Sequence, residues 1–407
     1  MYKLTVAMGM MAAYYCVMPL FHGLLQKLLA LLACALLGLL LCQPKMRMVQ
    51  ITEKSTEETQ GERSAGIDLL KTLAIVLVFA FHFLFTIQYY QTPLSGGGMF
   101  LKTYVRWAAS ICVPLFIMIT GYLQKNKKPT WAYYSKFSVV IISYLLNAIL
   151  LILYLFFIHE LSKYSIRQTV NLERYWYLGL YLGLYLMIPL LNLAWQPLHR
   201  RGKQAVLLGL VVLSSLSTVC NGWMNAYWVG LFPILYYYCG AFVREYKVQV
   251  RRGVLVLLCC LLPLLPTLKT YFTLYGELFQ WRLFGGYCNE YNAFPTVAAT
   301  LCAFLLCYQI HIRSRMLRKW LGYAAVASLE IYLLTVTNFG SEIPALVLRL
   351  LPNTPIVFSF LIALCLSMAV NTFLGYWLHR LSSSLSRRLV NKVNRNISPP
   401  NGAVPMV

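Results

Sequence analysis

Long apolar segments recur along almost the whole chain of 407 residues. About 20 consecutive apolar residues, folded as an α-helix, span the hydrocarbon core of a bilayer. Hydrophobic residues make up 59% of the chain and charged residues only 12%, a balance that excludes an ordinary soluble domain. Alternating segments of about ten residues, which are typical of a membrane barrel, are absent from the sequence. The sequence therefore predicts an all-α, polytopic membrane helix bundle.

The charges between these segments predict which loops face the cytoplasm. Every second loop is rich in Lys and Arg, and such loops stay on the cytoplasmic side of a membrane. The net charge of +23 is thus explained by basic loops and a lipid bilayer, and it predicts no nucleic-acid partner. We expect apolar segments at residues 4–20, 24–42, 66–88, 106–124, 137–158, 176–194, 205–220, 228–243, 253–272, 292–310, 321–338 and 355–379.

The alternation of loops divides the chain into four parts. Residues 66–380 form a predicted core of ten spans, and residues 381–407 form a basic cytoplasmic tail. Residues 1–43 are one extra span or a hairpin of two spans. We favour the hairpin because it returns the polar, basic linker of residues 44–65 to the cytoplasm. Both termini are then cytoplasmic in a multi-pass protein of a bacterial-type plasma membrane.

His82 is the strongest candidate for a catalytic residue because it lies deep inside the apolar segment 66–88. An ionisable group at membrane depth is costly and often functional, and a neutral imidazole can accept and donate a proton. Lys71 lies three helical turns before His82 on the same face, and Asp68 can pair with Lys71 from one turn away. For His82, a bundle histidine held by a neighbouring helix is equally open. A structural ion pair at the inner end is equally open for Lys71 and is favoured for Asp68.

Other polar residues stand at positions where substrates would meet the membrane. Glu330 is a buried carboxyl within the segment 321–338, and it either pairs with His82 or stays protonated. Lys125, Lys127 and Lys128 can contact the phosphates of a cytoplasmic donor, or they only fix the topology. The stretch 173–176 is predicted to face outward, where it binds a sugar acceptor or serves as an interfacial belt. Its residues are Glu173, Arg174, Tyr175 and Trp176. The cysteine and histidine spacings predict no metal site.

Four stretches of the chain resemble membrane acyltransferase family 3 over residues 63–380. Residues 67–71 followed by His82 resemble its first core helix, in which ten residues separate a basic residue from a histidine. The stretch 113–123 resembles a second motif, with Thr120 in place of the usual serine. Residues 175–191 and 233–240 resemble two further blocks. The order of the four blocks and the ten-span core together carry the resemblance.

The resemblance implies an O-acyltransferase that transfers groups other than aminoacyl groups. The family moves an acyl group, above all acetyl, from a cytoplasmic acyl-coenzyme A to hydroxyls of cell-surface or exported glycans. Acyl-coenzyme A is then a donor substrate, and no bound cofactor is implied. A histidine in the membrane would deprotonate the acceptor hydroxyl or carry the acyl group. The residues 328–335 depart from the family, because Thr335 stands where a histidine is often found and Glu330 replaces a small residue.

Two functions of other classes remain open on the sequence. A transporter or flippase for a sugar or small polar solute would also need polar residues at membrane depth. A catalytically silent partner could keep the same fold. Release of coenzyme A by the purified protein distinguishes an enzyme from both.

Overall fold

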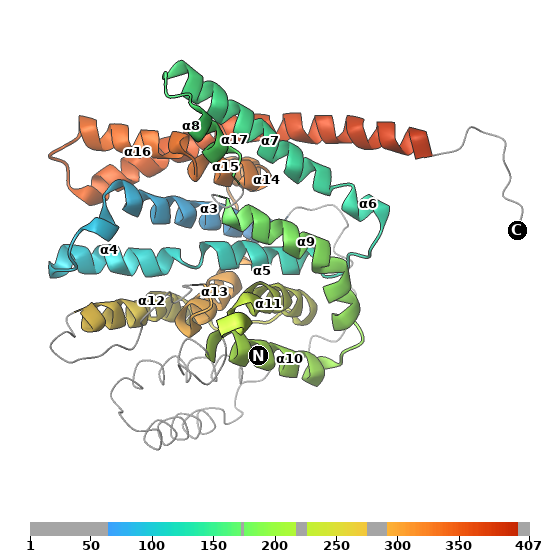
Figure 1. The fold of residues 1–407 in the computed structure, drawn as a ribbon. Helices are drawn as coiled ribbons and strands as arrows, with labels where there is room; N and C mark the ends of the chain where they lie inside the picture. Colours follow the sequence, from blue (N-terminus) through green and yellow to red (C-terminus); the bar gives the residue numbers. More distant parts are fainter. Residues whose placement is uncertain (1–63, 172–174, 217–225, 275–290, 398–407) are drawn as a thin grey trace, which may run out of the picture. The chain divides into compact units, whose positions relative to one another are not determined.

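The computed structural model describes residues 64–171, 175–216, 226–274 and 291–397. These residues form helices joined by short connections, with no strand among them (Figure 1). The predicted all-α class is therefore confirmed. The predicted N-terminal hairpin, nearly all of the linker, and Glu173 and Arg174 lie outside the described residues.

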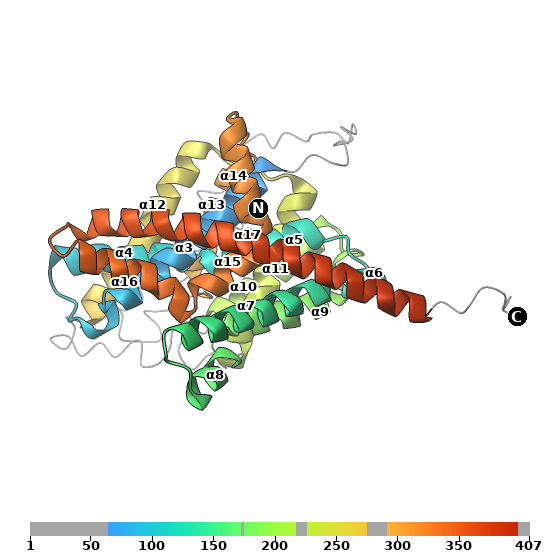
Figure 2. The ribbon, with the colours of Figure 1, turned by 90° about the horizontal axis from the view of Figure 1, so that it is seen from above.

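Most of the helices match the predicted apolar segments to within a few residues, since each segment is long enough to satisfy its own backbone groups in lipid. Figures 1 and 2 show them from two directions. The principal helices are α3 (Ala65–Thr86), α4 (Gly96–Ala109), α5 (Cys112–Gln124), α7 (Phe137–Phe157), α9 (Trp176–Trp195), α10 (Arg200–Leu216), α11 (Phe232–Tyr246), α12 (Arg252–Leu274), α13 (Phe294–Cys307), α14 (Arg315–Val326), α15 (Ser328–Thr335), α16 (Asn338–Leu350) and α17 (Ile356–Ile397). The short helices are η2 (Tyr89–Gln91), α6 (Trp131–Tyr134), α8 (Lys163–Thr169) and η3 (Ala226–Leu231).

Several helices are long and apolar enough to cross a membrane. Five such helices lie among the described residues, and a sixth span results if two helices bent by 60° are counted together. The bent pair joins Ser328–Thr335 to Phe339–Leu350, while α12 and α13 contribute shorter apolar helices. A multi-pass membrane protein is thus shown, and the count of ten core spans stays a prediction.

Three features near the C-terminus differ from the prediction. The segment 321–338 is divided, because α14 ends at Val326 and α15 begins at Ser328. Helix α16 occupies residues predicted as a loop. The sequence did not predict this helix because Glu342 and Arg349 lower the mean hydropathy of its amphipathic sequence. Helix α17 does not end near residue 379 but continues to Ile397.

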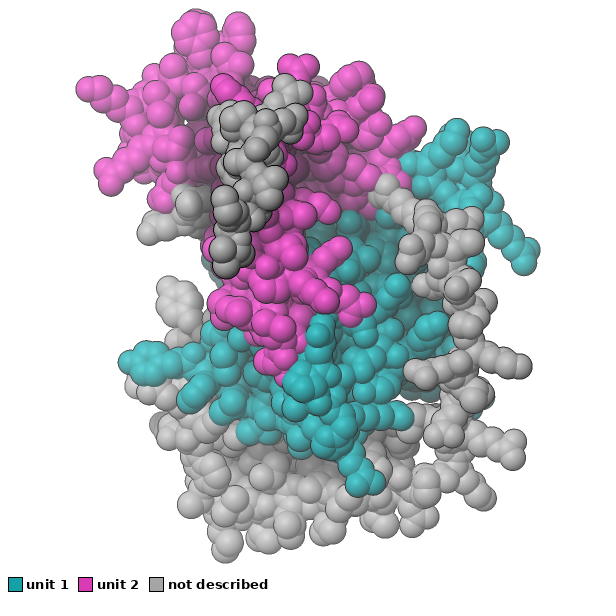
Figure 3. All heavy atoms as spheres, turned by 90° about the vertical axis from the view of Figure 1, so that its right-hand side faces the viewer, with its two compact units in different colours: residues 1–125, 195–321 teal, residues 126–194, 322–407 magenta. Residues whose placement is uncertain are grey.

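Helix contacts divide the chain into two compact units, which Figure 3 colours separately. The first comprises residues 1–125 and 195–321, and the second comprises residues 126–194 and 322–407. In the first unit, α5 packs between α3 and α11, and α12 packs against α4 and α13. In the second unit, α17 packs against α7, α15 and α16. Each unit therefore has its own bundle and is described by itself.

Two glycines let α5 and α11 touch backbone to backbone in the first unit. A Cβ atom at Gly121 would overlap the carbonyl group of Tyr237, and one at Gly240 would overlap that of Met118. Small residues at such crossings are a common basis of helix packing in membranes. Gly121 lies in one of the blocks that carry the family resemblance and Gly240 ends another, so at least part of each block serves packing.

We expect Gly121→Ala to destabilise the first unit, because the added methyl group meets backbone that cannot rotate away. Overpacking of this kind costs about 1–3 kcal/mol. The melting temperature and monodisperse yield of the detergent-solubilised protein measure the effect. Gly209→Ala on α10 is the matched control, since a Cβ atom there meets nothing within 4 Å. Equal melting temperatures for the two variants would contradict the close packing of α5 on α11.

Candidate functional site

His82 lies four residues before the end of α3, in the first unit. Its ring is partly buried and lies 5.8 Å from the ring of Phe85, centroid to centroid. Neither ring nitrogen has a hydrogen-bond partner among the described residues. His82 is therefore not a histidine that a neighbouring described helix holds by a hydrogen bond.

Lys71 shares an unbroken helix with His82, as the sequence predicts, because α3 runs from Ala65 to Thr86. At 100° per residue the eleven-residue separation brings both side chains to nearly the same face, about 16 Å apart along the axis. Asp68, one turn before Lys71, is buried. The face of α3 thus carries a cation toward its predicted cytoplasmic end and an imidazole toward the other end.

A second ionic group lies at the basic end of the first unit, where three helices meet. The Lys203 ammonium of α10 lies 2.6 Å from the Glu245 carboxylate of α11, and the Lys125 ammonium lies 3.5 Å from it. Lys203 is only 5% exposed and lies over the rings of Trp195 and Tyr246. Lys125, predicted to bind donor phosphates, is therefore held by a carboxylate that neutralises part of its charge.

The environment of Glu245 predicts how this group responds to acid. Burial works against the charged form, but the hydrogen bond from Lys203 and the charges of Lys125 and Lys203 outweigh it. Together they hold the pKa of the carboxyl below its usual value of 4.5. A carboxyl with a lowered folded-state pKa stabilises the protein above its unfolded pKa, and this contribution disappears as the pH falls through the folded pKa.

We expect Glu245→Gln to lower the stability of the protein at pH 7 by about 1–3 kcal/mol, because it leaves the buried Lys203 ammonium without its carboxylate. The difference between variant and wild type should shrink as the pH falls below about 4.5. Melting temperatures in detergent between pH 3.5 and 7 measure both effects. A difference that is the same at every pH would contradict the ionic pairing.

The remaining predicted binding residues have varied surroundings in the second unit. Lys127 and Lys128 are exposed, and the Lys127 carbonyl accepts a hydrogen bond from Asn192. Tyr175 is fully buried with its ring against Tyr144, whereas Trp176 is 42% exposed. Of the predicted acceptor-binding stretch, Trp176 is thus the described residue with an aromatic face open to a ligand.

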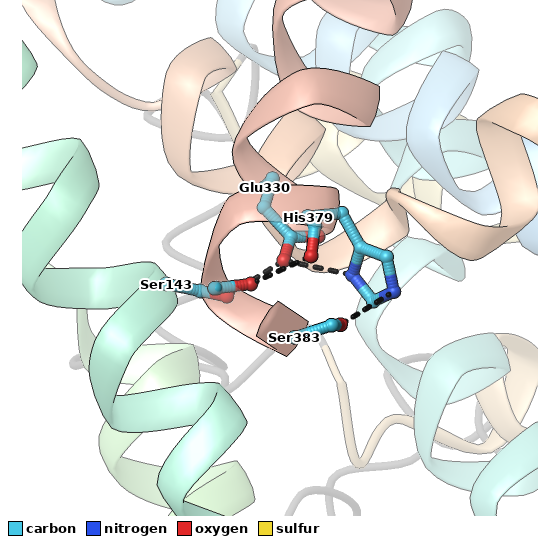
Figure 4. Close-up of polar contacts among 5 residues, drawn as sticks. Ser143, Glu330, His379 and Ser383 are labelled. Carbon is cyan, nitrogen blue, oxygen red and sulfur yellow. Dashed lines mark hydrogen bonds and ion pairs between the residues drawn. The ribbon is translucent and has the colours of Figure 1, made fainter. Parts of the chain in front are cut away.

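Glu330 is the centre of a polar network in the second unit (Figure 4). It lies in the first turn of α15 and is 1% exposed. Its Oε1 accepts a hydrogen bond of 2.6 Å from the Ser143 hydroxyl of α7 and lies 3.0 Å from His379 Nδ1 of α17. Its Oε2 is buried with no hydrogen-bond partner among the described residues.

The network continues through His379 to a serine on the same helix. His379 Nε2 lies 3.3 Å from the Ser383 hydroxyl, one turn further along α17 (Figure 4). A carboxylate at Nδ1 requires the proton on that nitrogen, which leaves Nε2 as the acceptor for Ser383. The exposure increases along this path, since Glu330 is buried and the His379 side chain is 27% exposed. Carboxylate, imidazole and hydroxyl thus lie in the order that activates a hydroxyl group.

Sequence reasoning found Glu330 but missed His379, Ser143 and Ser383. His379 was placed at the edge of an apolar segment because α17 was expected to end there. The helical spacing of the leucines after residue 379 was the available signal that the helix continues. Close approach of α15 and α17 then depends on Gly375, where a Cβ atom would lie 2.8 Å from Ile331 Cγ1.

Thr335, at the place where relatives often carry a histidine, makes structural hydrogen bonds. Its hydroxyl donates to the Ile331 carbonyl at 2.7 Å and accepts from Asn371 Nδ2 at 3.3 Å. Asn371 lies on α17 two turns before His379. In this chain, therefore, the imidazole that contacts α15 is that of His379 on α17. It contacts Glu330, and position 335 is occupied by a threonine.

Residues 64–376 match the family model described as an acyltransferase domain. The chain belongs to acyltransferase family 3. No curated protein and no solved structure matches it. The match covers most of the chain and includes His82, Lys71 and Glu330, while His379 and Ser383 lie just beyond its end.

Membership establishes this protein as a membrane O-acyltransferase, and the family resemblance read from the motifs is confirmed. Among the described residues, no three His, Cys, Asp or Glu side chains lie close enough together to hold a metal ion. The imidazole of α3 and the network of Glu330, His379 and Ser383 are candidate groups for acyl transfer.

Proposed function

We propose that this acyltransferase moves an acetyl group from cytoplasmic acetyl-coenzyme A to a hydroxyl of a cell-surface or exported glycan, with His82 as the catalytic base. The observation that carries the proposal is the state of His82. It lies within a membrane span, its ring nitrogens have no hydrogen-bond partner among the described residues, and Lys71 shares its face. An imidazole in this state can accept a proton from an incoming hydroxyl.

The proposed step is a nucleophilic substitution at the acyl carbon. The acceptor oxygen attacks the carbonyl carbon of the acyl group while its proton passes to His82. The bond from that carbon to the leaving group breaks, and the leaving group takes up the proton. No oxidation or reduction occurs. His82 thereby acts as base and then as acid.

The basic residues support a phosphate-bearing donor on the cytoplasmic side. Lys127 and Lys128 are exposed and can meet phosphates directly, while Lys71 lies on the face that leads to His82. Lys125 contributes less because Glu245 holds it. On the opposite side, the exposed ring of Trp176, with Tyr175, Glu173 and Arg174 beside it in sequence, is proposed to bind the sugar. The positive-inside rule supports cytoplasmic termini in a plasma membrane.

The test of the proposed function is release of coenzyme A by the purified protein in detergent. Acetyl-coenzyme A is supplied with and without glycan extracted from the cell surface. Thiol release that depends on the glycan, together with acetyl esters on the recovered glycan, supports the proposal. Ester formation with another acyl donor but not with acetyl-coenzyme A would overturn the choice of donor. Turnover without acylated glycan would overturn the choice of acceptor.

We expect Lys71→Ala to raise the KM for acetyl-coenzyme A by about tenfold, a loss in the range of one charge-assisted hydrogen bond. Lys71→Arg should keep much of the activity because either cation can meet a phosphate. Asp68→Asn is the control, since a purely structural pair would make both variants lose folded yield equally. A normal KM for the donor with a poor yield of Lys71→Ala would remove Lys71 from the site.

A further inference from the structure

We propose that Ser383 is a nucleophile of this acyltransferase, activated by His379 and Glu330, and that it carries the acyl group as an ester before the acceptor receives it. This inference deepens the proposed function by adding a covalent intermediate. It rests on the arrangement of Glu330, His379 and Ser383 within the second unit.

The geometry assigns one role to each member. Glu330 Oε1, 3.0 Å from His379 Nδ1, fixes the tautomer that leaves Nε2 unprotonated. Nε2 lies 3.3 Å from the Ser383 hydroxyl and can take its proton as attack begins. Ser143 donates to the same carboxylate oxygen and holds it in place. Glu330 and Ser143 are thus positioning residues, whereas His379 and Ser383 meet the substrate.

Helix α17 adds a cation on the same face. His379, Ser383 and Arg387 are spaced by four residues, so the three side chains follow one line along the helix. Arg387 Nε donates to the Ser383 backbone carbonyl at 3.2 Å. Negative charge develops on the acyl oxygen during attack, and a nearby cation stabilises it. Base, nucleophile and cation thus come from one helix.

The position along α17 is where a cytoplasmic donor would arrive. His379 lies 23 residues after Ile356, or about 34 Å along the axis, which is close to the thickness of the hydrocarbon core. The residues around it include the exposed Arg380, Arg387 and Arg388, which mark the predicted cytoplasmic edge. Ser383 is partly exposed there, so a thioester with a charged carrier reaches it without entering the lipid.

The chemical step balances with a thioester donor. Ser383 Oγ bonds to the carbonyl carbon and its proton passes to His379 Nε2. The carbon–sulfur bond breaks, and the sulfur leaves as a thiol with the proton from Nε2. In the second half, an acceptor hydroxyl attacks the carbonyl carbon of the serine ester, the bond from that carbon to Ser383 Oγ breaks, and Ser383 Oγ takes up the proton that the acceptor releases.

The experiment uses the full-length protein in detergent with carbon-14-labelled acetyl-coenzyme A and no acceptor. We expect close to one acetyl group per chain, resistant to neutral hydroxylamine, which cleaves cysteine thioesters. Mass spectrometry should place it on Ser383. Ser383→Ala should lose the label and at least 100-fold in turnover, and His379→Ala should lose the label. Ser384→Ala, at the neighbouring hydroxyl, is the matched control and should label like wild type.

A second reagent separates this inference from the proposed function. A fluorophosphonate labels an activated serine without any acyl donor. Protein that acylates glycan but gains no label on Ser383 from either reagent would overturn the inference and leave the proposed function standing. The same holds if Ser383→Ala turns over within twofold of wild type. Fluorophosphonate on Ser383 in protein that never uses acetyl-coenzyme A would instead overturn the donor assignment and support the nucleophile.

Discussion

Replacing His82 by alanine should reduce acyl transfer by about 10²–10⁴-fold while leaving the folded protein intact, because general acid–base catalysis contributes a factor of that size. The ring of His82 has no hydrogen-bond partner among the described residues, so its removal breaks no polar contact there. Turnover of acetyl-coenzyme A with glycan, compared with the melting temperature, measures the two effects separately. His82→Gln keeps the size and polarity of the side chain but cannot act as a base, and it should be equally inactive.

The matched control for His82 is His311→Ala, which removes an exposed histidine of the same unit. Its turnover should equal that of the wild type. Turnover of His82→Ala within threefold of wild type would remove His82 from the mechanism. Equal losses of activity and folded yield would mean that His82 only supports packing against its neighbours on α3.

Glu330→Gln should lower turnover by about 10²–10⁴-fold, because an amide no longer fixes the imidazole tautomer that accepts a proton from Ser383. The substitution conserves volume in a site that is 1% exposed, so packing of α15 against α7 and α17 is retained. The dependence of turnover on pH should change as well, because the substitution breaks the hydrogen-bonded pair of carboxylate and imidazole that takes the proton. Turnover from pH 5 to 9 measures both expectations.

Glu342→Gln is the control for this substitution, since Glu342 is an exposed carboxyl on α16 of the same unit. It should leave the rate and the pH profile unchanged. If Glu330 were only a structural acceptor for Ser143, then Glu330→Gln and Ser143→Ala would both lower stability, and the pH profile of turnover would stay that of the wild type. That outcome would contradict its positioning role.

The sequence predicted the helical class, the helix that carries His82, and the family. All three can be predicted from residues close together in the sequence. A membrane span is about 20 consecutive apolar residues, and a motif is a fixed spacing of residues along one helix. Lys71 and His82 lie on one helix, so their shared face needed no tertiary knowledge. The same reasoning placed Glu330 as a buried polar residue that needs a partner.

The partners of Glu330 could not be predicted, since they come from helices almost 190 residues and 49 residues away in the chain. Ser143 is an ordinary residue of an apolar segment until α7 meets α15. His379 was overlooked because polar residues after it lowered the hydropathy and ended the predicted segment, although the helix continues. Pairing of Lys125 with Glu245 is likewise a tertiary contact, across 120 residues.

The continuous length of helix α17 links its basic C-terminal end to His379. With 42 residues it is about 63 Å long, twice the hydrocarbon thickness, and His379 sits slightly beyond its midpoint. Its backbone hydrogen bonds make it a rod, so its basic end cannot turn on the membrane surface without turning His379 by a similar angle. Gly375 leaves Ile331 little room for such a turn. A rotation of the basic end about the helix axis would therefore also rotate the His379 imidazole relative to the Glu330 carboxylate.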